Sequence, residues 1–461
     1  MTGFDLRERR IDIGLSQSKL ADITGIEQAR ISAYELGKLH LSLNELTKIA
    51  NQLAKIDETV VQKLKKKRFQ NSLHLDSIVD QRPRRGFSKT KRNHEYLEVL
   101  KKLESQFKNP PNTGLKAVSF FAGCGGLCYG VQAAGFEIVA TNELVENYKA
   151  IYKLNFPNVN FLPNDVQEIT KSDIEMVLKN HQNIDLMVGG PPCQGFSLAG
   201  KRDVNDKRNT LFEYYLQIAE QIQPKIILIE NVRLLTSMKD PNGSLVSKRI
   251  LDTFEKIGYQ STFYHVNAKN FGVPQNRERV IFIAVRKDLK KSPAIAETKY
   301  ESSENLFNSK PPCFTLGDAI SDLAYLESGE TSEKDKLHRA VNHPEHVIRW
   351  LVDVPEGKSA HDNLDPNLRP PSGYNTTYKR QVWTEPAGTV STTFGMISGC
   401  RNVHPIATRA LTTREALRLQ SFPDSFQLTG NDGTIRTVIG NAVPPLLGFE
   451  LAKFIKENYM L

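Results

Sequence analysis

The residue best suited to covalent chemistry in this chain is Cys193, within Pro-Pro-Cys-Gln-Gly-Phe-Ser at 191–197. The run follows an apolar stretch, 184–188, and a Gly-Gly break. Two prolines lack amide donors and restrict φ, so the chain leaves its strand here in a stiff loop. A thiolate in such a loop can be a nucleophile, whereas most free cysteines are buried and inert. The loop alone leaves both readings of Cys193 open.

Three charged residues stand at the ends of other apolar stretches. Glu230 follows one such stretch, and Arg277 and Arg279 precede another. With the glutamine at 275, the two arginines alternate along an extended segment, so they form a fork of donors on one face. Such a fork can bind a carboxylate, a phosphate or a base carbonyl. We expect Glu230 at the same sheet edge as Cys193, one strand further on.

A glycine-rich turn, Ala-Gly-Cys-Gly-Gly at 122–126, follows the expected strand 117–121. Glycines at a strand-to-helix turn let the backbone approach a ligand closely, although this spacing departs from the dinucleotide motif. The expected strand 137–141 leads to Glu143, whose carboxylate can accept hydrogen bonds from two ribose hydroxyls. Asp165 follows the next strand and is suited to an adenine amine. These features fit an adenosyl ligand without a pyrophosphate.

These residues require a sheet to bring them together. From position 116 onward, expected strands alternate with helices, which predicts an α/β fold with a mostly parallel sheet and helices on both faces. Near the C-terminus, the run 438–445 and the apolar helix 446–455 return to this domain. The domain is therefore expected to be discontinuous, interrupted by a smaller lobe.

The first residues predict a separate all-α domain. Ser16 is an expected N-cap for a short helix, a glycine turn follows at 24–26, and a second helix covers 27–36. Ser42 opens a third helix. Two short helices joined by a glycine turn form a helix-turn-helix, which places its second helix in the major groove of DNA. The runs 15–21 and 31–37 resemble the phage-repressor type of this motif, and a helical dimerisation bundle is the alternative.

Length and composition fit a protein of two or three domains. The chain has 461 residues and a formal net charge of +9. The segment 63–102 alone holds 13 Lys or Arg against 4 Asp or Glu, which suits either a solvated linker or an anionic polymer as partner. Five cysteines without a regular framework indicate reduced thiols, and no His/Cys cluster suggests zinc. We expect a cytoplasmic protein without a membrane span or a metal site.

Six motifs in order resemble the signature of DNA cytosine-5 methyltransferases. They lie at 121–126, 191–197, 230–232, 275–279, 409–424 and 440–445, and the likeness covers about 115–460. It implies a Rossmann-like domain dependent on S-adenosyl-L-methionine, with a smaller target-recognition domain. The family's chemistry adds a cysteine thiolate to carbon 6 of a flipped cytosine, which makes carbon 5 electron-rich.

The resemblance assigns roles to individual residues. It implies catalytic roles for Cys193, Glu230, Arg277 and Arg279, with Glu230 protonated through burial to support ring nitrogen 3. It implies cofactor contacts at Phe121, Ala122, Gly123, Cys124, Gly125, Gly126, Glu143, Asp165, Pro191, Asn441 and Val443. Cys124 and Leu144 depart from the family's more usual aliphatic and aromatic residues.

Double-stranded DNA is the expected partner of both domains. Gln194 and Ser197 in the cysteine loop, and Gln17, Gln28 and Arg30 in the N-terminal domain, are the expected DNA-binding residues. In the recognition region the weaker candidates are Arg369, Tyr374, Thr376, Thr377 and Arg380. The expected domain plan is 1–56 helix-turn-helix, 57–114 basic linker, 115–288 catalytic domain, 289–378 recognition region and 379–461 return to the catalytic domain.

The sequence therefore predicts a DNA (cytosine-5-)-methyltransferase that modifies a specific duplex site, as the modification enzyme of a restriction-modification system. A second DNA reader implies a second DNA task, so the N-terminal domain is expected to regulate transcription of its own operon at a separate operator, as a homodimer. Two alternatives are a transcriptional regulator with a vestigial enzyme domain and an RNA cytosine methyltransferase.

Overall fold

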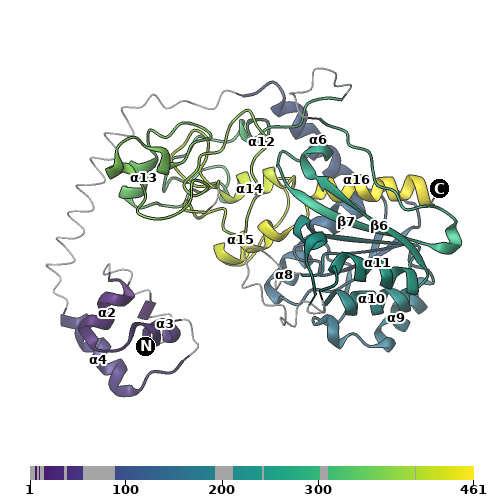
Figure 1. Cartoon of the computed structure of the whole chain (residues 1–461), viewed down its shortest axis with the longest axis horizontal. Helices are drawn as coiled ribbons and strands as arrows, with labels where there is room; N and C mark the ends of the chain where they lie inside the picture. Colours follow the sequence, from purple (N-terminus) through teal and green to yellow (C-terminus); the bar gives the residue numbers. More distant parts are fainter. Residues whose placement is uncertain are drawn as a thin grey trace. The chain divides into compact units, whose positions relative to one another are not determined.

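The computed structural model describes residues 6, 7, 10, 15–35, 39–55, 89–192, 211–240, 243–301, 310–399 and 401–460. The chain divides into two compact units, Met1–Arg85 and Gly86–Leu461. Each unit has a hydrophobic core of its own. Figure 1 shows the helices and strands of both units.

The N-terminal unit contains the predicted helix-turn-helix. Helix α2 spans Gln17–Thr24, α3 spans Gln28–Glu35 and α4 spans Leu43–Lys55. Ser16 caps α2 by accepting a hydrogen bond from the Lys19 amide, as predicted, and Gly25 ends the helix with a left-handed φ of 66°. The helices enclose a small core that includes Leu20, Ile31 and Ile49.

The larger unit is built on a seven-stranded sheet in the order β3-β2-β1-β4-β5-β7-β6. The first five strands pair in parallel, as the sequence predicts. Strand β7 pairs antiparallel with β5 on one side and with β6 on the other, and β6 has no counterpart among the predicted strands. The strands are β1 (Lys116–Phe120), β2 (Glu137–Thr141), β3 (Asn160–Phe161), β4 (Leu186–Gly189), β5 (Ile226–Val232), β6 (Tyr259–Asn267) and β7 (Glu278–Arg286).

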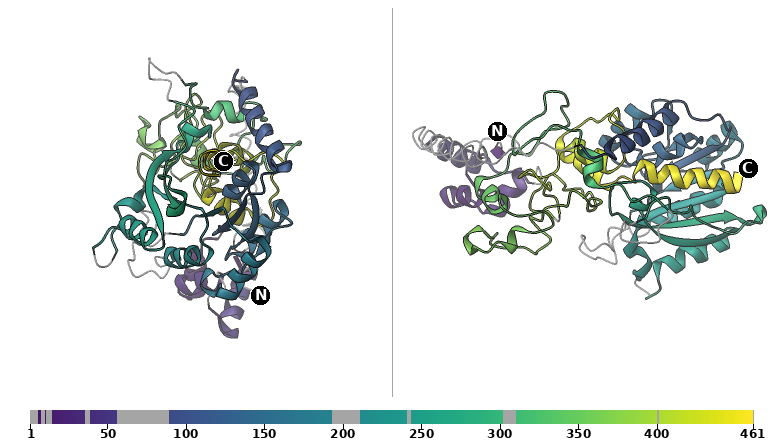
Figure 2. Two further views of the ribbon diagram at one scale, coloured as in Figure 1. Left: turned by 90° about the vertical axis from the view of Figure 1, so that its right-hand side faces the viewer. Right: turned by 90° about the horizontal axis from the view of Figure 1, so that it is seen from above.

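Helices cover both faces of this sheet because successive strand residues face opposite sides. In β5, Leu228 belongs to one core whereas Ile227 and Ile229 belong to the other. Helices α9 (Lys171–His181), α10 (Leu211–Ile222) and α11 (Val246–Lys256) supply the second core. Helices α6 (Asn93–Lys108), α7 (Gly126–Ala133) and α16 (Pro445–Ile455) supply the first, and Figure 2 shows the C-terminal α16 lying along the domain.

The stretch Asp432–Met460 has the length and hydropathy of a membrane span, but 67% of its most apolar window is buried inside the protein. It contains α15 (Asp432–Asn441) and α16, which are separated by Pro444. Its apolar side chains belong to the large core of the unit, as expected for the core helices of a globular domain.

Part of the range expected as a basic linker, 57–114, is structured. Helix α6 lies within it, and Tyr96, Leu100 and Leu103 of this helix are buried in the large core. Asn93 donates to the carbonyl of Asp318 in α12 (Leu316–Ile320) at 2.9 Å. The sequence predicted a linker here because the segment has many charged residues. The helix forms because α6 is amphipathic and buries its apolar face.

A smaller lobe follows β7 and has its own apolar cluster. Val347 and Leu351 of α13 (Glu345–Leu351) pack with Val403 and Ala410. The lobe thus includes residues well beyond 378, where the sequence analysis ended the recognition region. Arg380, a candidate DNA contact, is only 2% exposed and donates to the carbonyls of His404, Ala407 and Leu351. We therefore correct its role to an internal support of the lobe.

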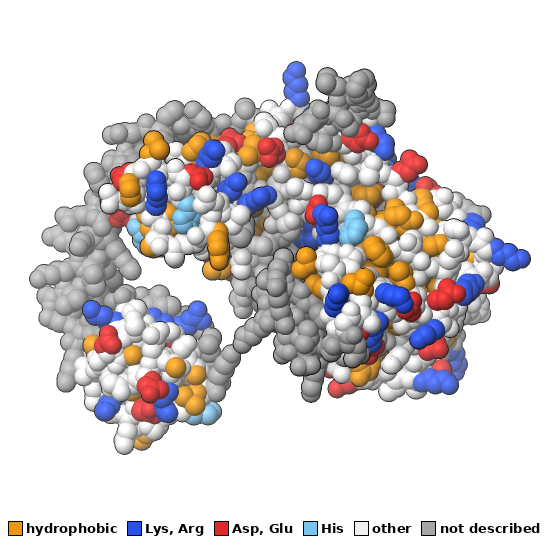
Figure 3. All heavy atoms as spheres, viewed as in Figure 1, with side chains coloured by type: hydrophobic (Ala, Val, Ile, Leu, Met, Phe, Trp, Pro, Cys, Tyr) orange, Lys and Arg blue, Asp and Glu red, His pale blue; other side chains and the backbone are white. Residues whose placement is uncertain are grey.

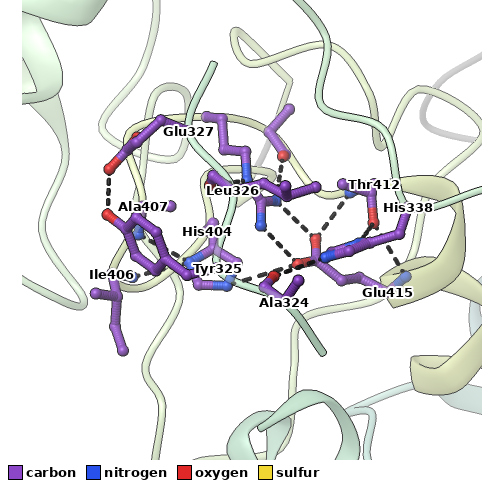
Figure 4. A network of polar contacts seen from close by, with 12 residues as sticks. Ala324, Tyr325, Leu326, Glu327, His338, His404, Ile406, Ala407, Thr412 and Glu415 are labelled. Atoms are coloured by element: carbon purple, nitrogen blue, oxygen red, sulfur yellow. Dashed lines mark hydrogen bonds and ion pairs between the residues drawn. The ribbon is translucent and has the colours of Figure 1, made fainter. Parts of the chain in front are cut away.

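A buried polar network joins this lobe to α14 (Thr413–Leu419), as Figure 4 shows. Arg409 donates to both carboxylate oxygens of Glu415, at 2.7 and 2.8 Å, and to the Leu326 carbonyl at 2.7 Å. Burial opposes ionisation of Glu415, but the Arg409 guanidinium holds its pKa below the usual range. His404 accepts from the amides of Ile406 and Ala407, so it is neutral.

A second buried histidine, His343, accepts a hydrogen bond at Nε2 from the Ala410 amide (3.1 Å). Burial lowers the pKa of His343 from 6.5 to about 4, and the nearby Arg409 and Arg436 act in the same direction. Protonation would remove the acceptor that holds Ala410.

We predict that this histidine makes the larger unit sensitive to mild acid. In the unfolded chain His343 takes up a proton near pH 6.5, and in the folded protein only near pH 4. The free energy of unfolding therefore falls as the pH falls through that window. From pH 7 to 5 the loss is about 2 kcal/mol. Urea unfolding of the wild type and of His343→Gln, at both pH values, should give a smaller loss in the variant; equal losses would contradict the prediction.

Candidate active site

A pocket of about 630 Å³ lies at the carboxyl ends of the central parallel strands. A volume of this size accommodates a small organic ligand. Residues at the carboxyl ends of β1 to β5 and at the start of β7 line the pocket, together with the C-terminal return. The lining includes Phe121, Ala122, Gly123, Gly126, Glu143, Asp165, Pro191, Glu230, Arg277, Arg279, Asn441 and Val443.

The glycine-rich turn forms one wall of the pocket. Phe121 leaves β1 with a left-handed φ of 55°, which is uncommon for a side chain of this size. Gly126 approaches the returning chain so closely that a Cβ would lie 2.3 Å from the Val443 carbonyl oxygen. Cys124 and Gly125, also expected to contact the cofactor, are not among the lining residues. The Cys124 thiol is 1% exposed, and burial raises its pKa to about 12.

Glu143 closes the adjacent wall. Its Oε2 accepts from the Gly123 amide (2.8 Å) and its Oε1 from the Val145 amide (2.9 Å), so the carboxylate ties the end of β2 to the glycine turn. Burial raises the pKa of Glu143, and the amide donors oppose that shift. Beside it, Asp165 accepts from the Gln167 amide at 3.0 Å and begins a short 3₁₀ turn.

Glu230 lines the same pocket, near the carboxyl end of β5. It is 8% exposed, and its Oε1 lies 2.9 Å from Nε of Arg279. The neighbouring Asn231 donates to the Pro191 carbonyl at 2.8 Å and so holds the start of the cysteine loop against β5. Cys193, Gln194 and Ser197 lie outside the described residues; Pro191 and Pro192, which precede them, line the pocket.

The two arginines expected as one fork have different partners. Arg279 pairs with Glu230, whereas Arg277 is 1% exposed and donates to the carbonyls of Gly440 (3.2 Å) and Ala442 (2.9 Å). Burial lowers the pKa of Arg277, and the nearby Arg279 adds to the effect. Arg277 thus fastens the C-terminal return, including Asn441 and Val443, to the sheet edge.

Other residues that line this pocket were not predicted from the sequence. Tyr148 and Asn231 were not assigned to it, and Leu144 was noted only as a departure. Tyr148 lies in the first turn of α8 (Glu146–Asn155), whereas Leu144 precedes the N-cap of that helix. Their position shortly after Glu143 was the available signal for both, whereas nothing local marks Asn231 apart from its position after Glu230.

The expected DNA-binding residues of the N-terminal unit are described as well. Gln28 and Arg30 are exposed on α3, and Arg30 forms an ion pair with Glu45 of α4 at 2.9 Å. Gln17 is half-buried and donates to Glu35 at 2.7 Å, beside the buried ion pair of Arg10 with Glu35. Burial opposes ionisation of Glu35, but hydrogen bonds from Arg10 and Gln17 lower its pKa.

Charge on the larger unit is mixed over the face drawn in Figure 3. Lys and Arg side chains there are interspersed with Asp and Glu. The strongly basic part of the sequence, 63–102, falls mainly within residues that are not described.

Comparison with known proteins identifies the class. The family model of C-5 cytosine-specific DNA methylases matches residues 115–457, and a helix-turn-helix model matches residues 6–59. The chain is 35% identical over 346 residues to the Type II methyltransferase M1.HphI of Haemophilus parahaemolyticus, covering 74% of this chain and 86% of the relative. It is 30% identical to M.DdeI of Desulfomicrobium norvegicum, covering 74% and 88%.

The chain therefore belongs to the C-5 cytosine-specific DNA methylase family and is a DNA cytosine-5 methyltransferase with an additional N-terminal helix-turn-helix. Its fold matches a solved structure of a prophage-encoded E. coli protein, with a TM-score of 0.58 and 23% identity, over 75% of this chain and 100% of that one.

We predict that Arg277 matters to folding more than a surface arginine does. Arg277→Met removes the guanidinium donors from two buried carbonyls and should lower the free energy of unfolding by about 3 kcal/mol. Arg233→Met, which removes an exposed ion pair with Glu278, should change it by less than about 0.5 kcal/mol. Denaturant unfolding of both variants measures the difference, and a similar small effect for the two would contradict the assignment.

Proposed function

We propose that the pocket binds S-adenosyl-L-methionine along the glycine turn and Glu143, and receives a flipped cytosine at Glu230 and Arg279. The observation that carries the proposal is the convergence of these two pairs of groups on one pocket. The relatives are named Type II methyltransferases, which supports a role as the modification enzyme of a restriction-modification system acting in the cytoplasm.

The residues present fit an adenosyl ligand. Backbone at Phe121–Gly123 is open to close approach, and Glu143 offers acceptor oxygens for ribose hydroxyls. Asp165, Asn441 and Val443 would complete the contacts around the adenosyl group. The bound ligand supplies the methyl group.

In the proposed mechanism Cys193 is the nucleophile. Its sulfur bonds to carbon 6 of the cytosine, and the electron pair of the 5,6 double bond makes carbon 5 nucleophilic. Carbon 5 would take the methyl group as S-adenosylhomocysteine leaves, a base would remove the carbon 5 proton, and the double bond would re-form as the thiolate leaves. The three cysteines among the described residues, Cys124, Cys128 and Cys313, are buried with raised pKa values, which makes them unsuitable for this step.

Glu230 would hold ring nitrogen 3 of the cytosine while negative charge builds up during the attack. Arg279 would orient the Glu230 carboxyl through their contact and donate to the carbonyl oxygen of the base. In this proposal Arg277 does not contact the base; it holds the backbone at Gly440 and Ala442 in place.

We predict that Cys193→Ala abolishes transfer of a tritiated methyl group to duplex DNA, because no thiolate remains to activate carbon 5. Glu230→Gln should retain binding of both substrates and lower kcat by about 10²–10⁴-fold, as for the loss of a positioned acid-base group. Bisulfite sequencing of DNA from cells expressing the wild type identifies the duplex to use. Full activity of Cys193→Ala on that duplex would reject the proposed nucleophile.

We also propose a second DNA-binding task for the N-terminal unit, as a homodimer at an operator of its own operon. The exposed Gln28 and Arg30 on α3, the second helix of the motif, support binding in a major groove. The two-fold symmetry of such operators favours a dimer.

We predict that deleting residues 1–56 raises expression from a reporter fused to the operon promoter, while the methylation of chromosomal DNA persists. Gln28→Ala with Arg30→Ala should act in the same direction, because both changes remove groups suited to base edges. Reporter activity that stays the same in both variants would reject the operator proposal without affecting the enzymatic one.

A further inference from the structure

Two glutamines from distant parts of the chain meet in the interior of the larger unit. Gln275 precedes β7, Gln420 follows α14, and both are 0% exposed. Gln275 Nε2 donates to Oε1 of Gln420 and to the Leu419 carbonyl, each at 3.0 Å. Because a buried amide without partners is costly, this pairing fixes the orientation of both side chains.

The other polar atom of each side-chain amide bonds to a different part of the protein. Oε1 of Gln275 accepts from the Val390 amide at 3.0 Å, whereas Nε2 of Gln420 donates to the Ile439 carbonyl at 2.7 Å. The result is an unbroken, directional chain of hydrogen bonds from the Val390 amide through both glutamines to Ile439. We call these two residues the glutamine pair.

On the lobe side, Val390 lies in the segment 387–402. Backbone hydrogen bonds attach the start of this segment to the catalytic domain, from Asn276 to Ala387 (2.7 Å) and from Ala387 to Pro274 (2.9 Å). Further along, Met396 presents a side chain that is 53% exposed. Asn402 fixes this turn by donating to the carbonyls of Thr393 (2.8 Å) and Met396 (3.0 Å).

On the pocket side, Ile439 directly precedes residues 440–443, which line the proposed cofactor pocket. These residues, the end of α15 and the start of the loop after it, are called the pocket loop below. The two segments also touch directly. A Cβ at Gly440 would lie 2.4 Å from the Thr392 amide nitrogen and 2.5 Å from the Ser391 carbonyl carbon. The segment 387–402 and the pocket loop therefore share one packed contact and one buried chain of hydrogen bonds.

We propose that the glutamine pair consists of positioning residues that couple duplex binding at the segment 387–402 to cofactor binding at the loop 440–443. The proposal rests on the function proposed for the pocket. Duplex DNA held by the smaller lobe fixes the segment, and the pair transmits this constraint to the Ile439 carbonyl and the pocket wall. Since coupling is reciprocal, a bound cofactor then strengthens binding of the duplex by the same factor.

The test measures the Kd of S-adenosylhomocysteine for the full chain by calorimetry, with and without a duplex that the wild type methylates. We expect the duplex to tighten binding by at least fivefold in the wild type. Gln275→Leu and Gln420→Leu should each reduce this enhancement to less than twofold, and change the Kd without DNA by less than twofold. The double variant should lose no more than either single variant, because both residues act in one chain.

Gln381→Leu is the matched control. Gln381 is also a buried glutamine that holds the same segment, through the Gly388 amide at 2.7 Å, but it does not reach the pocket loop. The control should keep the enhancement. The proposal would be overturned if Gln381→Leu lost the enhancement, or if Gln275→Leu or Gln420→Leu kept it. Additive losses in the double variant would also overturn it.

A second measurement needs no variant and holds even if a substitution prevents folding. Hydrogen exchange of the wild-type backbone around 440–447 should slow when the duplex is added without cofactor. Unchanged exchange would overturn the coupling. A wild-type Kd for S-adenosylhomocysteine that is the same with and without the duplex would overturn it as well. Either result leaves methyl transfer itself intact, whereas a wild type that binds no S-adenosylhomocysteine would reject the proposed pocket instead.

Discussion

The attachment of the C-terminal return to the sheet edge is the constraint on which the pocket depends. Arg277 provides it, as a fully buried guanidinium whose donors reach the carbonyls of Gly440 and Ala442. These groups are 163 and 165 residues away along the chain. A buried cation is costly unless it is hydrogen-bonded, so these two contacts offset part of the cost of burying Arg277. Without it the pocket would lose the wall that Asn441 and Val443 form.

The parallel half of the sheet could be predicted because its signals are local. Strand β2 was predicted with its observed bounds, and Ser16 caps its helix as predicted. The parallel strands are short apolar runs that are buried almost throughout, and capping depends on neighbours within three residues. The same reasoning located Glu143, Glu230 and Arg279 at the pocket.

The rest depended on contacts between distant residues. The antiparallel direction of β7 is set by its pairing with β5 and β6, which no local pattern encodes. Arg277 and Arg279 alternate along the chain as expected, yet one binds carbonyls from the return segment and the other pairs with Glu230. Arg380 likewise resembles an exposed DNA contact in sequence, but four carbonyls and a hydroxyl of its own lobe surround its guanidinium. In the buried network around Glu415 (Figure 4), Arg409 similarly donates to the Leu326 carbonyl, 83 residues away along the chain.

The central claim is that Cys193 attacks carbon 6 of a cytosine held at this pocket. The most direct test uses a duplex that the protein methylates, with 5-fluorocytosine at the modified position. Fluorine cannot leave as a proton does, so elimination is blocked and the sulfur–carbon 6 bond should persist. Peptide mass spectrometry after incubation with S-adenosyl-L-methionine should then find the nucleotide on Cys193. An adduct on another cysteine, or no adduct despite methyl transfer to the unmodified duplex, would contradict the account.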